Sequence, residues 1–135
     1  MALSERNALN LWRNTLVEIV RSDAPDLTAR QQALLAVIAL EAGPHTVRGL
    51  ARGLNVAKPA ITRGIDALER CGFVRRIPDE DDLRSVFVER TVSGMDHLRT
   101  LATMMRRASG EDVPVSHQPD VYDQDLDRAA SAAAA

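Results

Sequence analysis

Aromatic residues are scarce in this chain of 135 residues, which contains one Trp, one Tyr and two Phe. The core must therefore be built mainly from aliphatic side chains, and binding of single-stranded nucleic acid by stacking bases on aromatic rings is disfavoured. A chain of this length is expected to form one domain with a sizeable core. An apolar fraction of 45% and a charged fraction of 27% are typical of an ordinary globular protein.

Cysteine is almost absent, since Cys71 is the only one. No disulfide can therefore form within the chain. Its position beside a glycine at a predicted helix end favours a buried, inert thiol over a redox sensor. The longest uninterrupted apolar run, residues 33–40, is too short to span a membrane. Charged residues also interrupt the N-terminal segment where a signal peptide would need its apolar region. These absences predict a cytoplasmic protein.

The few histidines show no spacing typical of a catalytic or metal site, since His45, His97 and His117 are far apart in the sequence. Residues 79–90 begin like a calcium-binding loop. Arg84 and Arg90, however, stand where that loop requires glycine and glutamate. We therefore expect no enzyme activity, no metal and no cofactor.

The formal net charge of −2 conceals an uneven distribution. Residues 109–135 carry six acids and one base, whereas residues 1–108 have a net charge of +3. No acid occurs between Glu41 and Asp66, and this acid-free segment carries Arg48, Arg52, Lys58 and Arg63. Such a basic stripe attracts polyanions, and nucleic acid is the expected partner.

Two helices are predicted in the first third of the chain. Residues 4–22 carry an apolar stripe at helical spacing, and the proline at position 25 ends it. Thr28 and Gln31 have the spacing of a capping box, which predicts the start of a second helix. This helix is expected to end at Gly43-Pro44 and to bury Leu34, Leu35, Ile38 and Ala42.

A helix-turn-helix is predicted next. Thr46 is placed to cap a short third helix, and Pro59 lies near the start of a fourth. Asn55 occupies the turn between them, where asparagine tolerates the left-handed backbone that such turns commonly need.

Residues 73–77 and 86–90 are predicted to be two short strands joined by a polar loop, after the fourth helix has ended at Cys71-Gly72. Thr91 is placed to cap a fifth helix that runs through Arg107. The predicted fold class is therefore mainly α (α+β): a winged helix-turn-helix with a two-stranded wing, flanked by N-terminal and C-terminal helices.

The second helix of a helix-turn-helix inserts its N-terminal part into the major groove of duplex DNA. Arg63 is suited to a bidentate contact with guanine, and Thr62 to a thymine methyl group or a phosphate. The alternative is a polar, solvated helix face, because this geometry also occurs in proteins that bind no DNA. The predicted major-groove residues are Ala57, Lys58, Pro59, Ala60, Thr62 and Arg63.

The loop between the two strands places Arg84 at the tip of the wing, where a narrow, A·T-rich minor groove would attract its guanidinium group. Four acids at residues 79–82 precede it. The alternative is a solvated loop in which Asp81 or Asp82 forms an ion pair with Arg84 or Arg76. The candidate contacts to the DNA backbone are Thr46, Arg48 and Arg75.

Five segments of the chain match the motifs of one protein family in the same order. They are residues 27–31, 47–63, 68–76, 78–85 and 91–94. Together they resemble the MarR (multiple antibiotic resistance regulator) family of winged-helix transcription factors. The resemblance implies a homodimer that binds a palindromic promoter site, usually as a repressor. This chain departs from the family pattern in its acidic C-terminal segment and at Gly49, Leu83 and Arg90.

By this resemblance, the first and last helices form the dimer interface. The expected units are an N-terminal dimerisation helix at 1–26, a DNA-binding lobe at 27–90, a C-terminal dimerisation helix at 91–108, and an acidic tail at 109–135, either partly disordered or a short terminal helix. The predicted dimer contacts are Leu9, Trp12, Leu16, Leu98, Ala102 and Met105.

A small-molecule effector is a further implication of the resemblance. Trp12, Arg13 and Met104 are the candidate lining residues of an effector cleft, although Trp and Met at helical spacing are also typical of plain core or interface. The sequence thus predicts a sequence-specific, double-stranded DNA-binding transcriptional regulator of bacterial type. The alternative is a winged-helix protein-interaction module with weak or no DNA binding, which Leu83 and the acidic tail favour.

Overall fold

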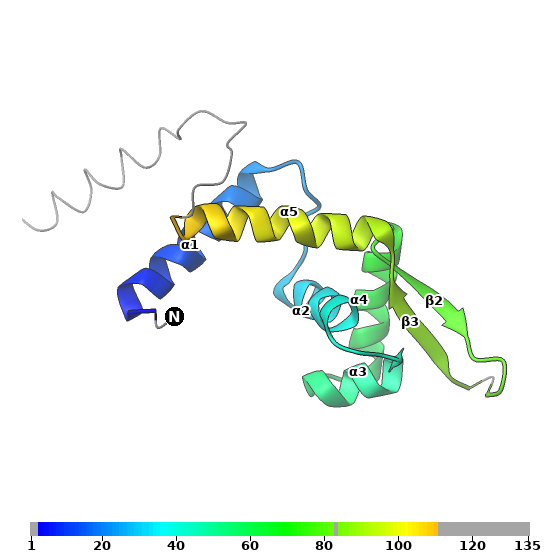
Figure 1. Cartoon of the computed structure of the whole chain (residues 1–135). Coiled ribbons are helices and arrows are strands. Elements are labelled where there is room, and N and C mark those ends of the chain that lie inside the picture. Colours follow the sequence, from blue (N-terminus) through cyan, green and yellow to red (C-terminus); the bar gives the residue numbers. More distant parts are fainter. Residues whose placement is uncertain (1–2, 83, 111–135) are drawn as a thin grey trace, which may run out of the picture.

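The computed structural model describes residues 3–82 and 84–110, which form five helices and a small three-stranded sheet. Helix α5 lies across α1 at one end and meets the junction of α4 and the hairpin at its other end (Figure 1). The helices are α1 (Glu5–Arg21), α2 (Ala29–Leu40), α3 (Val47–Leu54), α4 (Lys58–Arg70) and α5 (Val92–Ala108). The strands are β1 (His45–Thr46), β2 (Val74–Pro78) and β3 (Val86–Arg90). The predicted mainly α winged helix-turn-helix is confirmed.

Hydroxyl groups cap four of the predicted helices, and at the start of α1 Ser4 accepts a bond of 3.1 Å from the N–H of Asn7. Thr28 and Gln31 form the reciprocal capping box of α2, with bonds of 3.1 and 3.0 Å between side-chain oxygens and backbone N–H groups. Thr46 accepts a bond of 3.0 Å from the N–H of Gly49 and begins α3. Thr91 begins α5 in the same way. Of these helices, only α3 carries part of the basic stripe, at Arg48 and Arg52.

Helix α2 ends earlier than predicted, at Leu40 instead of Gly43-Pro44. Ala42 is exposed, so the prediction that it points inward is wrong. The physical reason is that side chains from other elements bond a carbonyl group in the last turn of the helix and that of the residue just after it. Arg90 donates to the carbonyl oxygen of Ala39 at 2.6 Å, and Nε2 of His45 lies 3.0 Å from that of Glu41.

The turn between α3 and α4 has the predicted geometry, because Asn55 adopts φ 53° and ψ 47°, the left-handed conformation. Helix α4 has no side-chain cap and carries Pro59 in its first turn. Gly64 lets α4 approach α2 closely, since a Cβ atom there would lie 2.5 Å from Cδ1 of Leu34. The recognition helix of the helix-turn-helix is therefore held tightly against the lobe.

The sheet has the order β1-β3-β2, with both pairs antiparallel. The two predicted strands are present, although β2 begins at Val74 and extends to Pro78. Sequence reasoning missed β1, whose two residues His45 and Thr46 pair with Val88 and Phe87 of β3. This short strand joins the start of α3 to the wing.

The main hydrophobic core lies inside the DNA-binding lobe and contains a single aromatic residue, Phe73. Full burial of one aliphatic side chain in this core contributes about 1.5 to 3 kcal/mol to the free energy of unfolding. Half-buried Leu98 and Cys71 pack against this core, so the thiol is less buried than predicted. The buried residues of the cluster are Leu34, Leu35, Ile38, Leu50, Ile61, Ile65, Leu68, Phe73, Val74 and Val88.

Candidate nucleic-acid interface

The first turns of α4 are open to solvent. Ala57, Lys58, Pro59 and Arg63 are exposed, whereas Ala60 and Thr62 are half-buried. Ile61, Gly64 and Ile65 occupy the buried side of the same helix. The amphipathic pattern of α4 therefore turns the predicted major-groove residues away from the core.

A four-bond network of Arg76 joins the wing to the recognition helix. Its Nη2 atom lies 2.5 Å from Oδ1 of Asp66 and 3.4 Å from the carbonyl oxygen of Thr62. Its Nη1 and backbone N–H both donate to the carboxylate of Glu69 at 3.1 Å. Asp66 and Glu69 lie on α4, so the guanidinium group of Arg76 is neutralised there and fixes β2 against that helix.

Arg76 therefore does not form the ion pair with Asp81 or Asp82 that was the alternative for the wing loop. The loop carboxylates instead accept bonds from backbone N–H groups of the turn. Asp79 accepts from the N–H of Asp81 at 2.9 Å, and Asp82 accepts from that of Arg84 at 3.0 Å. These acids shape the turn, and the described residues place no carboxylate in an ion pair with Arg84.

Arg75 lies on the other face of the wing. It pairs with Glu89, its cross-strand partner, through a bond of 2.6 Å from Nε, and both side chains are substantially exposed. Alternation along β2 places Arg76 and Arg75 on opposite faces, so Arg75 points away from α4. Its predicted role as a backbone contact stays a prediction.

A hollow of about 280 Å³ lies where α3, α4 and the wing meet. It brings together residues that the sequence assigned to three different DNA contacts: two to the backbone, two to the major groove and one to the minor groove. Three cations of the hollow, Arg48, Lys58 and Arg84, are exposed and form no ion pair with another described residue. The lining residues are Thr46, Val47, Arg48, Lys58, Thr62, Arg76, Arg84, Ser85 and Val86.

Sequence reasoning missed Val47, Ser85, Val86 and Arg76 at this hollow. Val86 was predicted only as the first residue of a strand, and Ser85 carried no signal of its own. A signal for Arg76 did exist. Asp66 and Glu69 are spaced by three residues on a helix, which places both carboxylates on one face, next to a strand rich in arginine.

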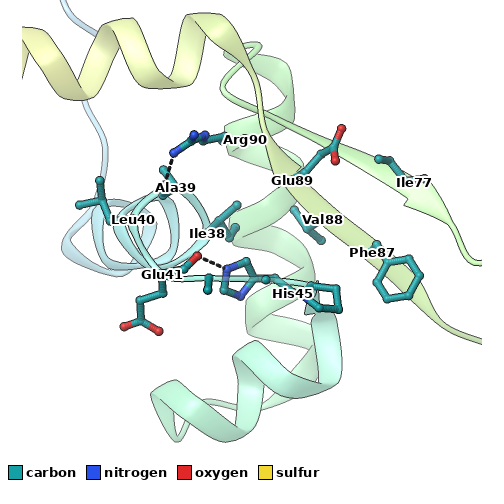
Figure 2. Close-up of a pocket in the computed structure, with 13 residues that line it drawn as sticks. Ile38, Ala39, Leu40, Glu41, His45, Ile77, Phe87, Val88, Glu89 and Arg90 are labelled. Atoms are coloured by element: carbon teal, nitrogen blue, oxygen red, sulfur yellow. Dashed lines mark hydrogen bonds between the residues drawn. The ribbon is translucent and has the colours of Figure 1, made fainter.

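A second hollow of about 840 Å³ lies beside the end of α2 (Figure 2). Figure 2 shows Arg90 and His45 on either side of that helix end. Arg90 is bonded to the carbonyl group of Ala39 in α2, and His45 to that of Glu41, the residue after the helix. One nitrogen atom of each side chain is thus already bonded within the chain. Trp12, Arg13 and Met104, the residues predicted for an effector cleft, line neither hollow.

Those three residues lie on α1 and α5. Trp12 is 65% exposed, Met104 is buried, and Nε of Arg13 donates to the side chain of Asn14 at 3.0 Å. Their role in effector binding stays a prediction.

The predicted dimer residues are also on α1 and α5, which an ion pair between Glu18 and Arg107 joins. Leu9, Trp12 and Met105 are 56%, 65% and 49% exposed, and Ala102 is exposed too. Leu16 is half-buried, and half-buried Leu98 packs on the core of its own lobe. An exposed apolar surface of this kind is expected where a partner binds.

The junction of α5 with the lobe is close-packed. Thr91 donates its hydroxyl to the carbonyl oxygen of Gly72 at 2.5 Å, and Gly94 packs against the backbone of Phe73. The ring of His97 stacks on that of Phe73 with centroids 4.4 Å apart. Burial lowers the pKa of His97 below its ordinary value of 6.5.

Among residues 3–82 and 84–110, no group of three or more His, Cys, Asp or Glu side chains is arranged to hold a metal ion. None of the helices formed by these residues is long and apolar enough to cross a membrane.

A helix-turn-helix followed by a β-hairpin defines a winged helix-turn-helix protein. The sequence model of the MarR family matches residues 27–86. Those residues form a MarR-family winged-helix lobe, and the family is one of transcriptional regulators.

Individual proteins agree with this assignment. The transcriptional activatory protein BadR of Rhodopseudomonas palustris is 38% identical over 88 residues, which are 64% of this chain and 50% of that protein. The chain thus spans about half the length of this curated relative.

Two solved structures have the same fold. Transcriptional regulator Tm0710 from Thermotoga maritima is 25% identical with a TM-score of 0.59, over 76% of this chain and 66% of that one. A cysteine-to-serine mutant of MarR from E. coli, complexed with operator DNA, is 25% identical with a TM-score of 0.59. That match covers 78% of this chain and 70% of the mutant.

Proposed function

We propose that this protein binds double-stranded DNA at specific sequences and regulates transcription, as a homodimer on a palindromic promoter site. The observation that carries the proposal is the cationic hollow, where Arg48, Lys58 and Arg84 converge from α3, α4 and the wing without ion-pair partners in the described chain. Unpaired cations at the N-terminus of a helix are suited to phosphate, because backbone N–H groups and the helix dipole add to their attraction.

The positions of the side chains support different DNA contacts for the recognition helix, the wing and the start of α3. Arg63 extends from the exposed side of α4 and is suited to read a base edge in the major groove. Arg84 is exposed on the wing and is suited to the minor groove of the same duplex. Thr46 and Arg48, at the start of α3, are suited to the sugar-phosphate backbone between the two grooves.

The homodimer is proposed from the exposed apolar residues of α1 and α5. Leu9, Trp12 and Met105 would leave water on association, and a symmetric pairing of these helices would join two lobes. A dimer with recognition helices about 34 Å apart would contact two half-sites one helical turn apart. The small-molecule effector stays a prediction, because no described hollow contains its predicted residues.

Repression is the sign of regulation that the family resemblance implies, since a dimer on a promoter competes with the polymerase. BadR, by contrast, carries the name of an activatory protein. A reporter gene under the selected promoter, with and without the protein, distinguishes the two signs.

The test is to select bound fragments from genomic DNA with the purified full chain and to measure its affinity for the selected site at several salt concentrations. The proposal expects one recurrent palindromic sequence and an affinity that falls steeply with salt. Recovery of no recurrent sequence would contradict it and would favour the alternative, a winged-helix module that binds another protein.

A further inference from the structure

The charges of this chain are separated into an exposed basic face and an acidic C-terminal segment. We define the basic face as Arg48, Lys58, Arg63 and Arg84, which are all exposed and form no ion pair with another described residue. The acids of the C-terminal segment lie outside the described residues and are Glu111, Asp112, Asp120, Asp123, Asp125 and Asp127.

We propose that the distal acids, Asp123, Asp125 and Asp127, bind the basic face when DNA is absent, and that duplex DNA must displace them. The proposal rests on the proposed function, because the surface is the same one that we assign to DNA. It adds a second occupant for that surface, which belongs to the chain itself. The chain would thereby weaken its own non-specific binding to DNA.

The chemistry of the hollow fits a carboxylate as well as a phosphate. Both are oxyanions that accept charge-assisted hydrogen bonds from Lys and Arg. Thr62 lines the hollow beside Lys58, and its hydroxyl group is a further potential donor, whereas the hydroxyl group of Ser85 already donates to Asp82. The neighbouring acids Asp66 and Glu69 are already bonded to Arg76, so the other cations of the hollow are left for an outside anion.

The length of the C-terminal segment determines which acids reach this surface. Helix α5 ends at Ala108, at the end of the molecule where α1 lies (Figure 1). The hollow lies at the N-terminal end of α4, whereas the C-terminal end of α4 lies near the start of α5. The path along α5 and α4 is about 45 Å at 1.5 Å per residue. An extended chain advances about 3.3 to 3.6 Å per residue, so counted from Ala108 it covers this path at about residue 121 or 122. Glu111 and Asp112 are too close to α5 to reach the hollow.

Because the acidic segment belongs to the same chain as the basic face, weak contacts are sufficient for it to bind there. A short linker raises the effective concentration of its end to the millimolar range, so a few exposed ion pairs can occupy the face for much of the time. Exposed pairs are screened by salt, with a Debye length of about 10 Å at 0.1 M. The occupancy should therefore be highest at low ionic strength.

The test compares two full-length variants that each lose two negative charges. Asp125→Asn/Asp127→Asn removes distal acids, and Glu111→Gln/Asp112→Asn is the matched control. The affinity of each protein for a non-specific DNA duplex is measured at low and high salt. The duplex has about 30 base pairs, which is about three helical turns. The distal variant should bind about three- to tenfold more tightly than the wild type at low salt, and the control less than about twofold. Equal gains would mean that only net charge matters, and no gain in the distal variant would equally overturn the proposal.

A second measurement uses no DNA. Backbone amide chemical shifts of the full chain are compared between the wild type and the two variants. The distal variant should shift the amides of Arg48, Lys58 and Arg84, and the control should leave them in place. Unchanged amides in the distal variant would overturn the proposal even if DNA binding were confirmed. If no variant binds DNA, the proposed function fails while the amide shifts still decide this inference.

Discussion

The guanidinium group of Arg76 on the wing and the carboxylate of Asp66 on the recognition helix lie 2.5 Å apart, and the same arginine also bonds Glu69. This bridge connects the two elements that we expect to enter neighbouring grooves of DNA. The side chain of Arg76 is 26% exposed, so the bridge is only partly screened by water. Because the bridge joins β2 to α4, it positions the wing as well as stabilising the lobe.

Arg76→Met should lower the free energy of unfolding by about 1 to 3 kcal/mol, the usual range for loss of hydrogen bonds to charged groups. Arg75→Met is the matched control, because the pair of Arg75 with Glu89 is exposed and should cost no more than about 1 kcal/mol. Urea unfolding of both variants measures the difference. Equal losses would show that the bridge to α4 is no stronger than a surface ion pair.

The close approach of Gly94 to Phe73 predicts a second difference. A Cβ atom at position 94 would overlap the carbonyl oxygen of Phe73, which is backbone and cannot move alone. Gly94→Ala should therefore destabilise the protein by about 1 to 3 kcal/mol.

The control for this prediction is Gly53→Ala. Gly53 lies within α3, and a Cβ atom there would meet no other atom within 4 Å. Alanine at that position should stabilise the helix by about 0.5 to 1 kcal/mol. Thermal unfolding of both variants gives the comparison, and a neutral Gly94→Ala would show that the junction with α5 adapts freely.

Acid should weaken the junction of α5 through His97. Burial lowers its pKa in the folded state below the unfolded value of 6.5, so the folded state favours the neutral ring. The unfolded state consequently binds more protons once the pH falls below about 6.5, and the free energy of unfolding decreases there. Above that pH the contribution is fully present.

The measurement is urea unfolding of wild type and His97→Phe between pH 8 and pH 5, bounds that are about 1.5 units on either side of the histidine pKa. The variant keeps an aromatic ring against Phe73 but cannot be protonated. The stability of the wild type should decline relative to the variant as the pH falls. Parallel curves would contradict the expected role of His97.

Local features of the fold were predictable from the sequence, whereas contacts between distant segments were not. The caps at Thr28, Thr46 and Thr91 depend on residues three positions away, and all three were predicted correctly. Strand β1 was missed because a two-residue strand has no periodicity, and its pairing with β3 arises only in the folded chain. The early end of α2 was missed for the same reason, since Arg90 lies 51 residues from its partner Ala39.

In the candidate interface, too, local features were predictable from the sequence and contacts between distant segments were not. Exposure of Lys58 and Arg63 follows from the helical period of α4, and sequence reasoning predicted it. The convergence of Arg48 and Arg84 with Lys58 at one hollow depends on the packing of α3 and the wing, which no local pattern records. Leu83, at which the sequence departs from the family, lies outside the described residues.

Arg63→Ala should cost about 1 to 3 kcal/mol of binding free energy on the selected site and should relax the base preference at one position in each half-site. Arg63 is exposed on α4, so the substitution should leave the unfolding free energy nearly unchanged. Affinities on a set of sites with single base changes measure the preference. A uniform loss on all sites would make Arg63 a phosphate contact.

Salt titration of DNA binding tests the central claim, that the wing and the recognition helix hold one duplex together. In a dimer, Arg84→Ala should make the slope of log affinity against log salt less steep by about 1.8, and Leu83→Arg should make it steeper by a similar amount, because each neutralised phosphate contributes about 0.9 and a dimer has two wings. Slopes that are indistinguishable among the wild type and the two variants would show that the wing does not touch DNA.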